Sequence, residues 1–360
     1  LHANVTVLPA ALAVAERKGT VSGEDLITAV AIGVDLVGRL GMGIITRPLD
    51  WIMTTVTGYF GAAVAAGKIL GMNEEGLHNA MGIAFTQTAG TLQTVADKVL
   101  VKRMLAGFAA RGGVLAAILT EKGITGVRNV FEGPWGFYTL YYDGKCDRER
   151  ILKGLGETFE GENLGVKLYM GNRRTHPCID AALSIVTRHD LKPDDVAEVV
   201  AHVNEATAIK VGGPFSIGEN PQVDAEFSIP YALALAVARR HVFVEDFEEE
   251  LIRSDMQVYE LSQKVRVIGD QGSIKDVGRG ATPCIIDIRT KDNRVYSERT
   301  DVTSGSPGKP ASMEDVAEKF RKCCAFSAKP LSKKRIAAII AMTADLEKVQ
   351  DIRSLLKLMV

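Results

Sequence analysis

The densest group of polar side chains lies in Lys167-Leu-Tyr-Met-Gly-Asn-Arg-Arg-Thr-His-Pro-Cys-Ile-Asp180. Three of its members, Lys167, Arg173 and Arg174, are cations that precede a predicted helix over Cys178 to Arg188. Cations at such a place are suited to hold the carboxylates of a small acid. The alternative interpretation is a capped helix start with solvated arginines.

His176 is the candidate proton-transfer residue of this segment. Thr175 or His176 is expected at the N-cap and Pro177 at the first helical position, where the missing N–H of proline costs nothing. Free backbone N–H groups and the helix dipole favour a bound anion there, and they favour the neutral, proton-accepting form of the imidazole. We therefore expect His176 to act as a general base.

Three further residues or pairs offer chemistry, each with a simpler structural explanation. Tyr231 follows Asp224-Ala-Glu-Phe-Ser-Ile-Pro and could supply a phenol as an acid, although a Tyr at a helix start is usually a packing residue. Lys102 and Arg103 could meet carboxylates as a point charge and a fork, or form a solvated helix start. His2 stands at the entry of the first helix, where it could also serve as a cap.

Composition and missing motifs exclude several classes of function. A formal net charge of -1 argues against nucleic acid and anionic membranes as partners. The apolar run from Ala29 to Ile45 is interrupted by Asp35 and Arg39 and falls short of a membrane span. The sequence lacks a Walker motif, a GxSxG elbow and a GxGxxG fingerprint. This argues against phosphoryl transfer, serine hydrolysis and hydride transfer as the reaction.

The five cysteines have no CxxC spacing and their number is odd. This fits a reducing compartment better than a disulfide framework, so a cytoplasmic protein is expected. No Cys/His spacing suits zinc or an iron–sulfur cluster, and we predict neither a metal nor another cofactor.

The first 160 residues predict consecutive helices that end at glycines. Two of these helices are rich in small residues, which permits close packing of helix axes. The expected helices run over Val5 to Lys18, Glu24 to Leu40, Thr54 to Leu70, Glu74 to Ala89 and Lys102 to Lys122.

The pattern changes from Lys167 onward to a mixture of helices and strands, and helices return from Met313 to the end. We therefore predict a mainly α protein with an α+β part: a helical domain of residues 1–165 and 310–360 and an inserted α+β lid of residues 166–309. The expected elements of the lid are helices over Cys178 to Arg188, Ala225 to Arg239 and Glu245 to Arg253, and strands over Ala197 to Asn204, Cys284 to Thr290 and Val295 to Thr300.

Taken together, the polar segments resemble the MmgE/PrpD family, which includes 2-methylcitrate dehydratases, cis-aconitate decarboxylases and iminodisuccinate epimerases. Four segments carry the resemblance in the right order over nearly the whole chain. They are His2 with Val7-Leu-Pro-Ala-Ala-Leu-Ala-Val-Ala15, Lys102-Arg103 with Gly107-Phe-Ala-Ala110, Thr175-His176-Pro177 with Ile179-Asp-Ala-Ala182, and Phe227-Ser-Ile-Pro-Tyr231. The resemblance implies a helical domain with an inserted lid, a homodimer and an earlier block of N-terminal helices, which we expect to be absent from this chain.

Position by position, the resemblance places catalytic residues at His2, Lys102, His176 and Tyr231. Independently of the resemblance, the cations that the sequence offers for substrate binding are Arg103, Lys167, Arg173 and Arg174. Ile52 and Leu105 stand where many members have histidine, which puts the dehydratase and decarboxylase activities in question.

The sequence therefore predicts a metal-independent lyase that resembles 2-methylcitrate dehydratase. Its substrate would be a small di- or tricarboxylate, on which it would move a proton at a carbon next to a carboxylate. A carboxylate epimerase or isomerase, a decarboxylase and a catalytically silent carboxylate-binding relative are the alternatives. We also expect Lys102 and Arg103 to line a cleft with His176 and Tyr231, which a moving lid would close.

Overall fold

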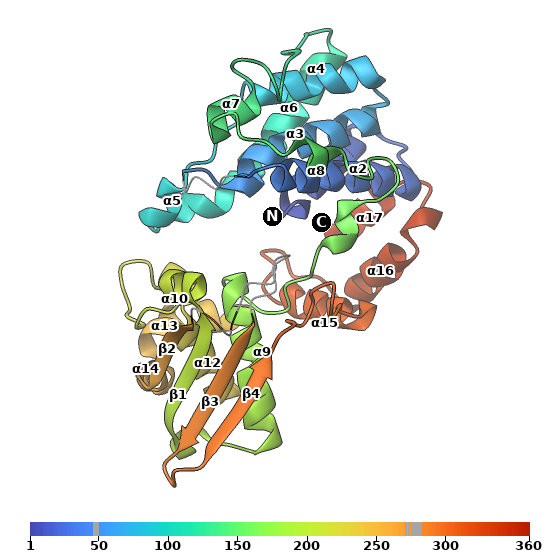
Figure 1. The fold of residues 1–360 in the computed structure, drawn as a ribbon. Coiled ribbons are helices and arrows are strands. Elements are labelled where there is room, and N and C mark those ends of the chain that lie inside the picture. Colours follow the sequence, from blue (N-terminus) through green and yellow to red (C-terminus); the bar gives the residue numbers. More distant parts are fainter. Residues whose placement is uncertain (46–49, 271, 273, 275–282) are drawn as a thin grey trace. The chain divides into compact units, whose positions relative to one another are not determined.

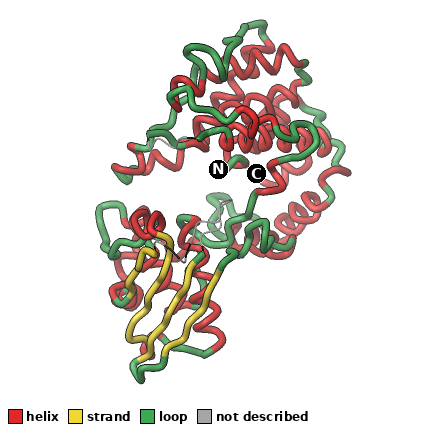
Figure 2. Tube along the Cα trace, viewed as in Figure 1, coloured by secondary structure: helices red, strands yellow, loops and turns green. Residues whose placement is uncertain are grey.

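The computed structural model describes residues 1–45, 50–270, 272, 274 and 283–360. The chain divides into two compact units, one of residues 1–162 and 327–360 and one of residues 163–326. The first is helical, and the second carries a four-stranded sheet with helices (Figures 1 and 2). The predicted fold class, mainly α with an α+β part, is confirmed.

Long helices of the first 121 residues form most of the helical unit, and small residues allow them to approach closely. A Cβ atom added at Gly33 of α2 would come within 2.7 Å of the carbonyl oxygen of Gly61 in α3, so the two helices meet at glycines. Helix α3 also packs against α1 and α6. The helices are α1 (Asn4–Lys18), α2 (Gly23–Met42), α3 (Met53–Leu70), α4 (Glu74–Phe85) and α6 (Leu105–Glu121), close to the ranges predicted from the sequence.

Among the described residues, one helical stretch, Leu100–Glu121, is long and apolar enough to cross a membrane by length and composition. It consists of the 3-10 turn η1 (Leu100–Met104) and α6. Helix α6 packs against α1, α3 and α4 through a face of small buried residues, as in a helical bundle.

A buried arginine ties α2 to the segment that leaves the helical unit. Arg39 is 1% exposed, and its Nε donates to Asp35 Oδ2 at 2.7 Å. The remaining guanidinium N–H groups donate to the carbonyl oxygens of Ile151, Lys153, Gly154 and Thr158. The other oxygen of Asp35 accepts from the backbone N–H of Glu160 at 2.7 Å.

Further elements complete the helical unit. They are α5 (Gln93–Ala96), α7 (Phe137–Tyr142), α8 (Arg148–Leu152), η2 (Glu160–Asn163), whose last residue belongs to the second unit, α16 (Lys333–Ala344), η6 (Leu346–Lys348) and α17 (Arg353–Met359).

The sheet of the second unit has the strand order β2-β1-β3-β4. Strands β1 and β2 are parallel, while β3 pairs antiparallel with both β1 and β4. Helices α9 (His176–Arg188) and α12 (Ile229–Arg239) pack against the sheet, and their apolar side chains form the core of the unit with those of the strands. The strands are β1 (Val196–Asn204), β2 (Val265–Asp270), β3 (Cys284–Thr290) and β4 (Val295–Thr300).

Two expected helices of this unit are interrupted. The helix predicted over Ala225 to Arg239 is divided into α11 (Pro221–Glu226) and α12, because the Ser228 hydroxyl caps a new helix by accepting from the Tyr231 N–H. The acidic helix predicted over Glu245 to Arg253 consists of the 3-10 turn η5 (Val244–Phe247) and α13 (Glu249–Ser254). The other short elements are η3 (Arg173–Thr175), η4 (Pro193–Asp195), α10 (Glu205–Val211) and α14 (Met256–Gln263).

The structural boundary between the units near residue 326 differs from the boundary expected at residue 309. Helix α15 (Met313–Cys324) belongs to the second unit, where Lys319 Nζ donates to the Lys167 carbonyl oxygen. The Phe326 ring lies 6.4 Å from that of Phe243. These contacts join residues that are far apart in the sequence. The local hydrophobic pattern from which helices and strands are predicted therefore could not indicate this boundary.

Candidate active site around His176

His176 begins α9 and is fully buried, with 0% of its surface exposed. Neither ring nitrogen has a hydrogen-bond partner among the residues that the structure describes. The Gly171 carbonyl lies near the ring, but it accepts from Lys167 Nζ and makes no well-formed hydrogen bond with the imidazole. Buried polar side chains nearly always have partners, so an unpartnered imidazole points to a functional role.

The charges of three cations act on the imidazole: Lys167, Arg173 and Lys319. Burial, and then the charges of these three residues, lower the pKa of His176 from 6.5 to about 3. The ring is therefore neutral throughout the ordinary pH range, and it is a weak base as long as these positive charges are not offset. Burial likewise lowers the pKa of Arg173, and nearby Asp180 opposes that shift.

Tyr169 packs against one side of the imidazole, and Asp180 holds Tyr169 in place. The Tyr169 ring meets His176 edge to face, with ring centroids 5.4 Å apart. Its hydroxyl donates to Asp180 Oδ1 at 2.7 Å, and the other oxygen of Asp180 accepts from the Ser304 N–H at 2.8 Å. Because Asp180 stands one helical turn after His176, the pair of contacts fixes the tyrosine against the ring.

This arrangement can couple anion binding to proton transfer. A carboxylate placed among Lys167, Arg173 and Lys319 would offset the positive charges that now depress the pKa of His176. The imidazole would then take up a proton more readily while the substrate is bound. The group is thus suited to accept a proton from, or return one to, a carbon atom next to a carboxylate.

The depressed pKa of His176 predicts a specific acid sensitivity. An unfolded histidine titrates near 6.5, so between pH 6.5 and about 3 the unfolded chain takes up a proton that the folded chain does not. The stability contribution is full above pH 6.5, and the free energy of unfolding falls below it by up to about 1.4 kcal/mol per pH unit. Denaturant unfolding between pH 4.5 and 7.5 should show this slope in the parent and lose it in His176→Gln. Equal slopes in the two proteins would contradict the prediction.

Tyr231 lies in a different environment from the one predicted. It is 2% exposed, its ring packs 4.8 Å from that of Phe215, and its hydroxyl donates to the Asp246 carbonyl oxygen at 2.6 Å. Burial raises the pKa of its phenol. A hydroxyl committed to a buried carbonyl is a poor proton donor, so these surroundings favour the packing interpretation and argue against the predicted catalytic role.

His2, Lys102 and Arg103 belong to the helical unit. The backbone N–H of His2 donates to Thr54 Oγ1 at 3.1 Å, which places the histidine at the first turn of α3, close to Ile52. Lys102 is half-buried and Arg103 exposed, and both lie in η1 rather than in the predicted long helix. Their catalytic and binding roles remain predictions.

Arg174, the third predicted cation of the segment, contacts α10. Its Nη1 donates to Thr207 Oγ1 at 2.6 Å. Lys167 and Arg173 therefore act on His176, whereas Arg174 binds Thr207 of α10.

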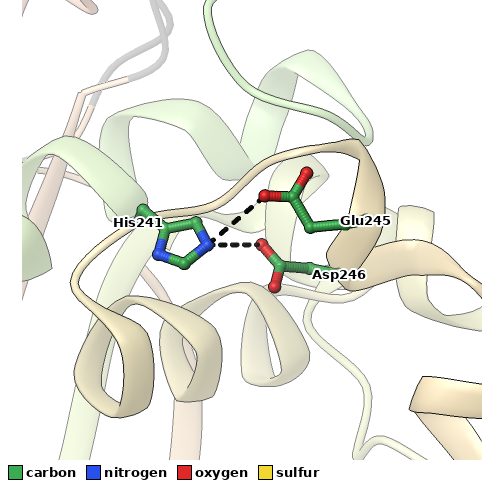
Figure 3. A group of neighbouring side chains, drawn as sticks. All are labelled: His241, Glu245 and Asp246. Atoms are coloured by element: carbon green, nitrogen blue, oxygen red, sulfur yellow. Dashed lines mark ion pairs between the residues drawn. The ribbon is translucent and has the colours of Figure 1, made fainter. Parts of the chain in front are cut away.

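A separate group of potential metal ligands consists of His241, Glu245 and Asp246 (Figure 3), whose ligand atoms lie within 4.8 Å of one another. His241 Nε2 is 3.6 Å from Glu245 Oε1 and 3.7 Å from Asp246 Oδ2. Asp246 also accepts from the Arg239 guanidinium and from the Phe243 N–H. A bound cation would compete with Arg239, so we interpret the group as an ion-pair network that joins α12 to η5.

Sequence reasoning missed Lys319, Tyr169 and Asp180 as members of the site. Lys319 is far from His176 in the sequence and is brought to it by the packing of α15. Tyr169 and Asp180 lie inside the polar segment, and the spacing of Asp180 from His176, one helical turn, was the available signal.

Comparisons with known proteins agree with the resemblance inferred from the sequence. The family models of the MmgE/PrpD N-terminal and C-terminal domains match residues 1–149 and 169–345. A cis-aconitate decarboxylase of Homo sapiens is 27% identical, with 97% of this chain and 72% of that protein covered. A cis-aconitate decarboxylase of Aspergillus terreus is 26% identical, with 100% of this chain and 76% of that protein covered. The cis-aconitate decarboxylase-like protein oryM of Aspergillus oryzae is also 26% identical, over 99% of this chain and 77% of its own length.

These relatives support the predicted class, a lyase that acts on a carboxylate. The two family models together span most of the chain in the order expected. The chain therefore belongs to the MmgE/PrpD family.

Proposed function

We propose that the chain is a lyase that removes carbon dioxide from a small unsaturated tricarboxylate such as cis-aconitate. The observation that carries the proposal is the buried, unpartnered imidazole of His176 among Lys167, Arg173 and Lys319. The relatives named as cis-aconitate decarboxylases support the choice of substrate. A cytoplasmic homodimer that works without a metal or other cofactor is part of the same proposal.

Decarboxylation makes the smallest demand on proton-transfer groups. The C–C bond to one carboxylate breaks, carbon dioxide leaves, and the bonding electron pair is delocalised toward the remaining carboxylates. Fixed cations stabilise this developing charge. His176, protonated once the substrate anion is bound, then delivers one proton to carbon.

Dehydration of a 2-methylcitrate-like substrate is the second candidate. It requires one group to take a C–H proton and another to protonate the departing hydroxyl. Tyr231 Oη donates to a backbone carbonyl, so Tyr231 is poorly suited to be the second group. Epimerisation also needs two proton-transfer groups, and a silent relative needs none.

One experiment separates these activities. The protein is incubated in deuterated water with cis-aconitate, citrate or 2-methylcitrate, and products are followed by NMR together with released carbon dioxide. Carbon dioxide release with one deuterium in the product is the expected result. Loss or gain of water without carbon dioxide would indicate a hydro-lyase, and exchange without net product would indicate an epimerase. Calorimetric binding with neither product formation nor deuterium exchange would indicate a catalytically silent relative.

Lys102→Met provides a test of the helical unit's contribution. We expect substrate binding and turnover to weaken together, because the change removes a positive charge rather than a proton-transfer group. Steady-state kinetics would be compared with Lys122→Met, which removes an exposed lysine at the end of α6. Equal kinetics in the two variants would remove Lys102 from the site.

A further inference from the structure

A second polar group lies next to the His176 site, at the end of β1. It consists of Asn204, Thr207 and Arg174. Helix α10, which carries Thr207, follows directly from β1 at this end of the sheet (Figure 1). Arg174 belongs to the same turn as Arg173, which acts on His176, so the two polar groups are neighbours along η3.

Asn204 has a donor without an acceptor. The side chain is 7% exposed, and its Nδ2 has no hydrogen-bond partner within the described ranges. The amide cannot be turned over, because Oδ1 accepts from the Thr207 N–H at 2.8 Å and an NH₂ group in its place would face another donor. Nδ2 is therefore a buried donor that requires an acceptor from outside the group.

Arg174 adds positive charge to the same polar group. Its side chain is half-buried, and Nη1 donates to the hydroxyl of Thr207, whose backbone N–H donates to Asn204 Oδ1. In the part of the chain that the structure describes, no carboxylate forms an ion pair with Arg174. Thr207 therefore contacts both side chains: its hydroxyl accepts from Arg174, and its backbone N–H donates to Asn204 Oδ1. In this way Thr207 positions the guanidinium of Arg174 and the amide of Asn204.

We infer that Asn204, Thr207 and Arg174 form a second carboxylate subsite, which selects substrates that carry an additional carboxylate. A fixed amide donor and a guanidinium are the groups that bind carboxylate oxygens in proteins. The inference rests on the proposed function, since the subsite would hold one end of the acid whose other end reacts at His176. Asn204 and Arg174 act as specificity-determining residues, and Thr207 as a positioning residue.

Asn204→Asp tests the subsite and keeps the cap of α10. An aspartate keeps the oxygen that caps α10 but replaces the unpartnered donor by a second negative oxygen. The KM for cis-aconitate should rise about tenfold to 100-fold, with a smaller change in kcat, as expected on losing a charge-assisted hydrogen bond. Asn73→Asp is the matched control, because Asn73 caps α4 by accepting from the Gly76 N–H and is exposed.

Arg174→Gln should raise the same KM, whereas Arg188→Gln, on the exposed end of α9, should not. A monocarboxylate analogue that lacks the extra carboxylate should bind the parent and Asn204→Asp alike.

Calorimetry with cis-aconitate separates the two hypotheses. If the parent binds cis-aconitate and Asn204→Asp does not, the subsite is supported. This holds even if the parent shows no turnover and the proposed reaction is wrong. Equal affinity and KM in parent and Asn204→Asp overturns the subsite and leaves the proposed reaction standing. A parent that binds no carboxylate overturns both.

Discussion

Turnover in His176→Gln should fall about 10²–10⁴-fold below that of the parent, which is the usual contribution of a positioned acid or base. Glutamine can keep the helix start and much of the volume of the imidazole, but it cannot exchange a proton. Lys167, Arg173 and Lys319 stay in place, so carboxylate binding should change little. Single-turnover kinetics with cis-aconitate, together with calorimetric binding, would measure the two effects separately.

His189→Gln is the matched control for this change. His189 follows α9 directly, is exposed, and packs its ring 4.3 Å from that of Tyr296. Its replacement should leave turnover near that of the parent. If His176→Gln also retains turnover within a few-fold of the parent, His176 is a structural residue and the proposed mechanism is wrong.

Local patterns in the sequence were sufficient for most elements of the fold. Strands β3 and β4 have the predicted limits, because alternating apolar residues flank a turn in which Asn293 adopts φ 65°. Strand β2 was not predicted: it is short, half-buried, and pairs in parallel with β1, more than 60 residues earlier in the chain. Parallel pairing between distant segments leaves no local signal.

The candidate site was predicted where its residues are neighbours in the sequence. Lys167, Arg173 and His176 lie within one short segment, and the structure gathers them. Lys319 and Asn204 come from other elements, and their roles depend on tertiary packing. Tyr231 shows the opposite problem, because its position at a helix start gave no sign that its hydroxyl binds a buried carbonyl.

The largest effect on stability is expected from Arg39→Met. In the sequence, Asp35 and Arg39 only interrupt an apolar run, but in the structure they form a buried ion pair one helical turn apart. Methionine would leave Asp35, which is 7% exposed, without its counter-charge. It would also remove the donors to four backbone carbonyls of residues 151–158. Breaking a buried pair in this way should lower the free energy of unfolding by about 3–5 kcal/mol.

Two further variants show why Arg39→Met should lower the free energy of unfolding. In Asp35→Asn/Arg39→Met no bare charge remains buried, so the double variant should recover part of the lost stability. Arg17→Met breaks a surface pair with Glu121, whose side chains are 44% and 37% exposed, and should leave the unfolding transition near that of the parent. Denaturant unfolding of the four proteins would measure this order. If Arg39→Met unfolds like Arg17→Met, the segment of residues 151–158 is held by other contacts and the arginine is dispensable.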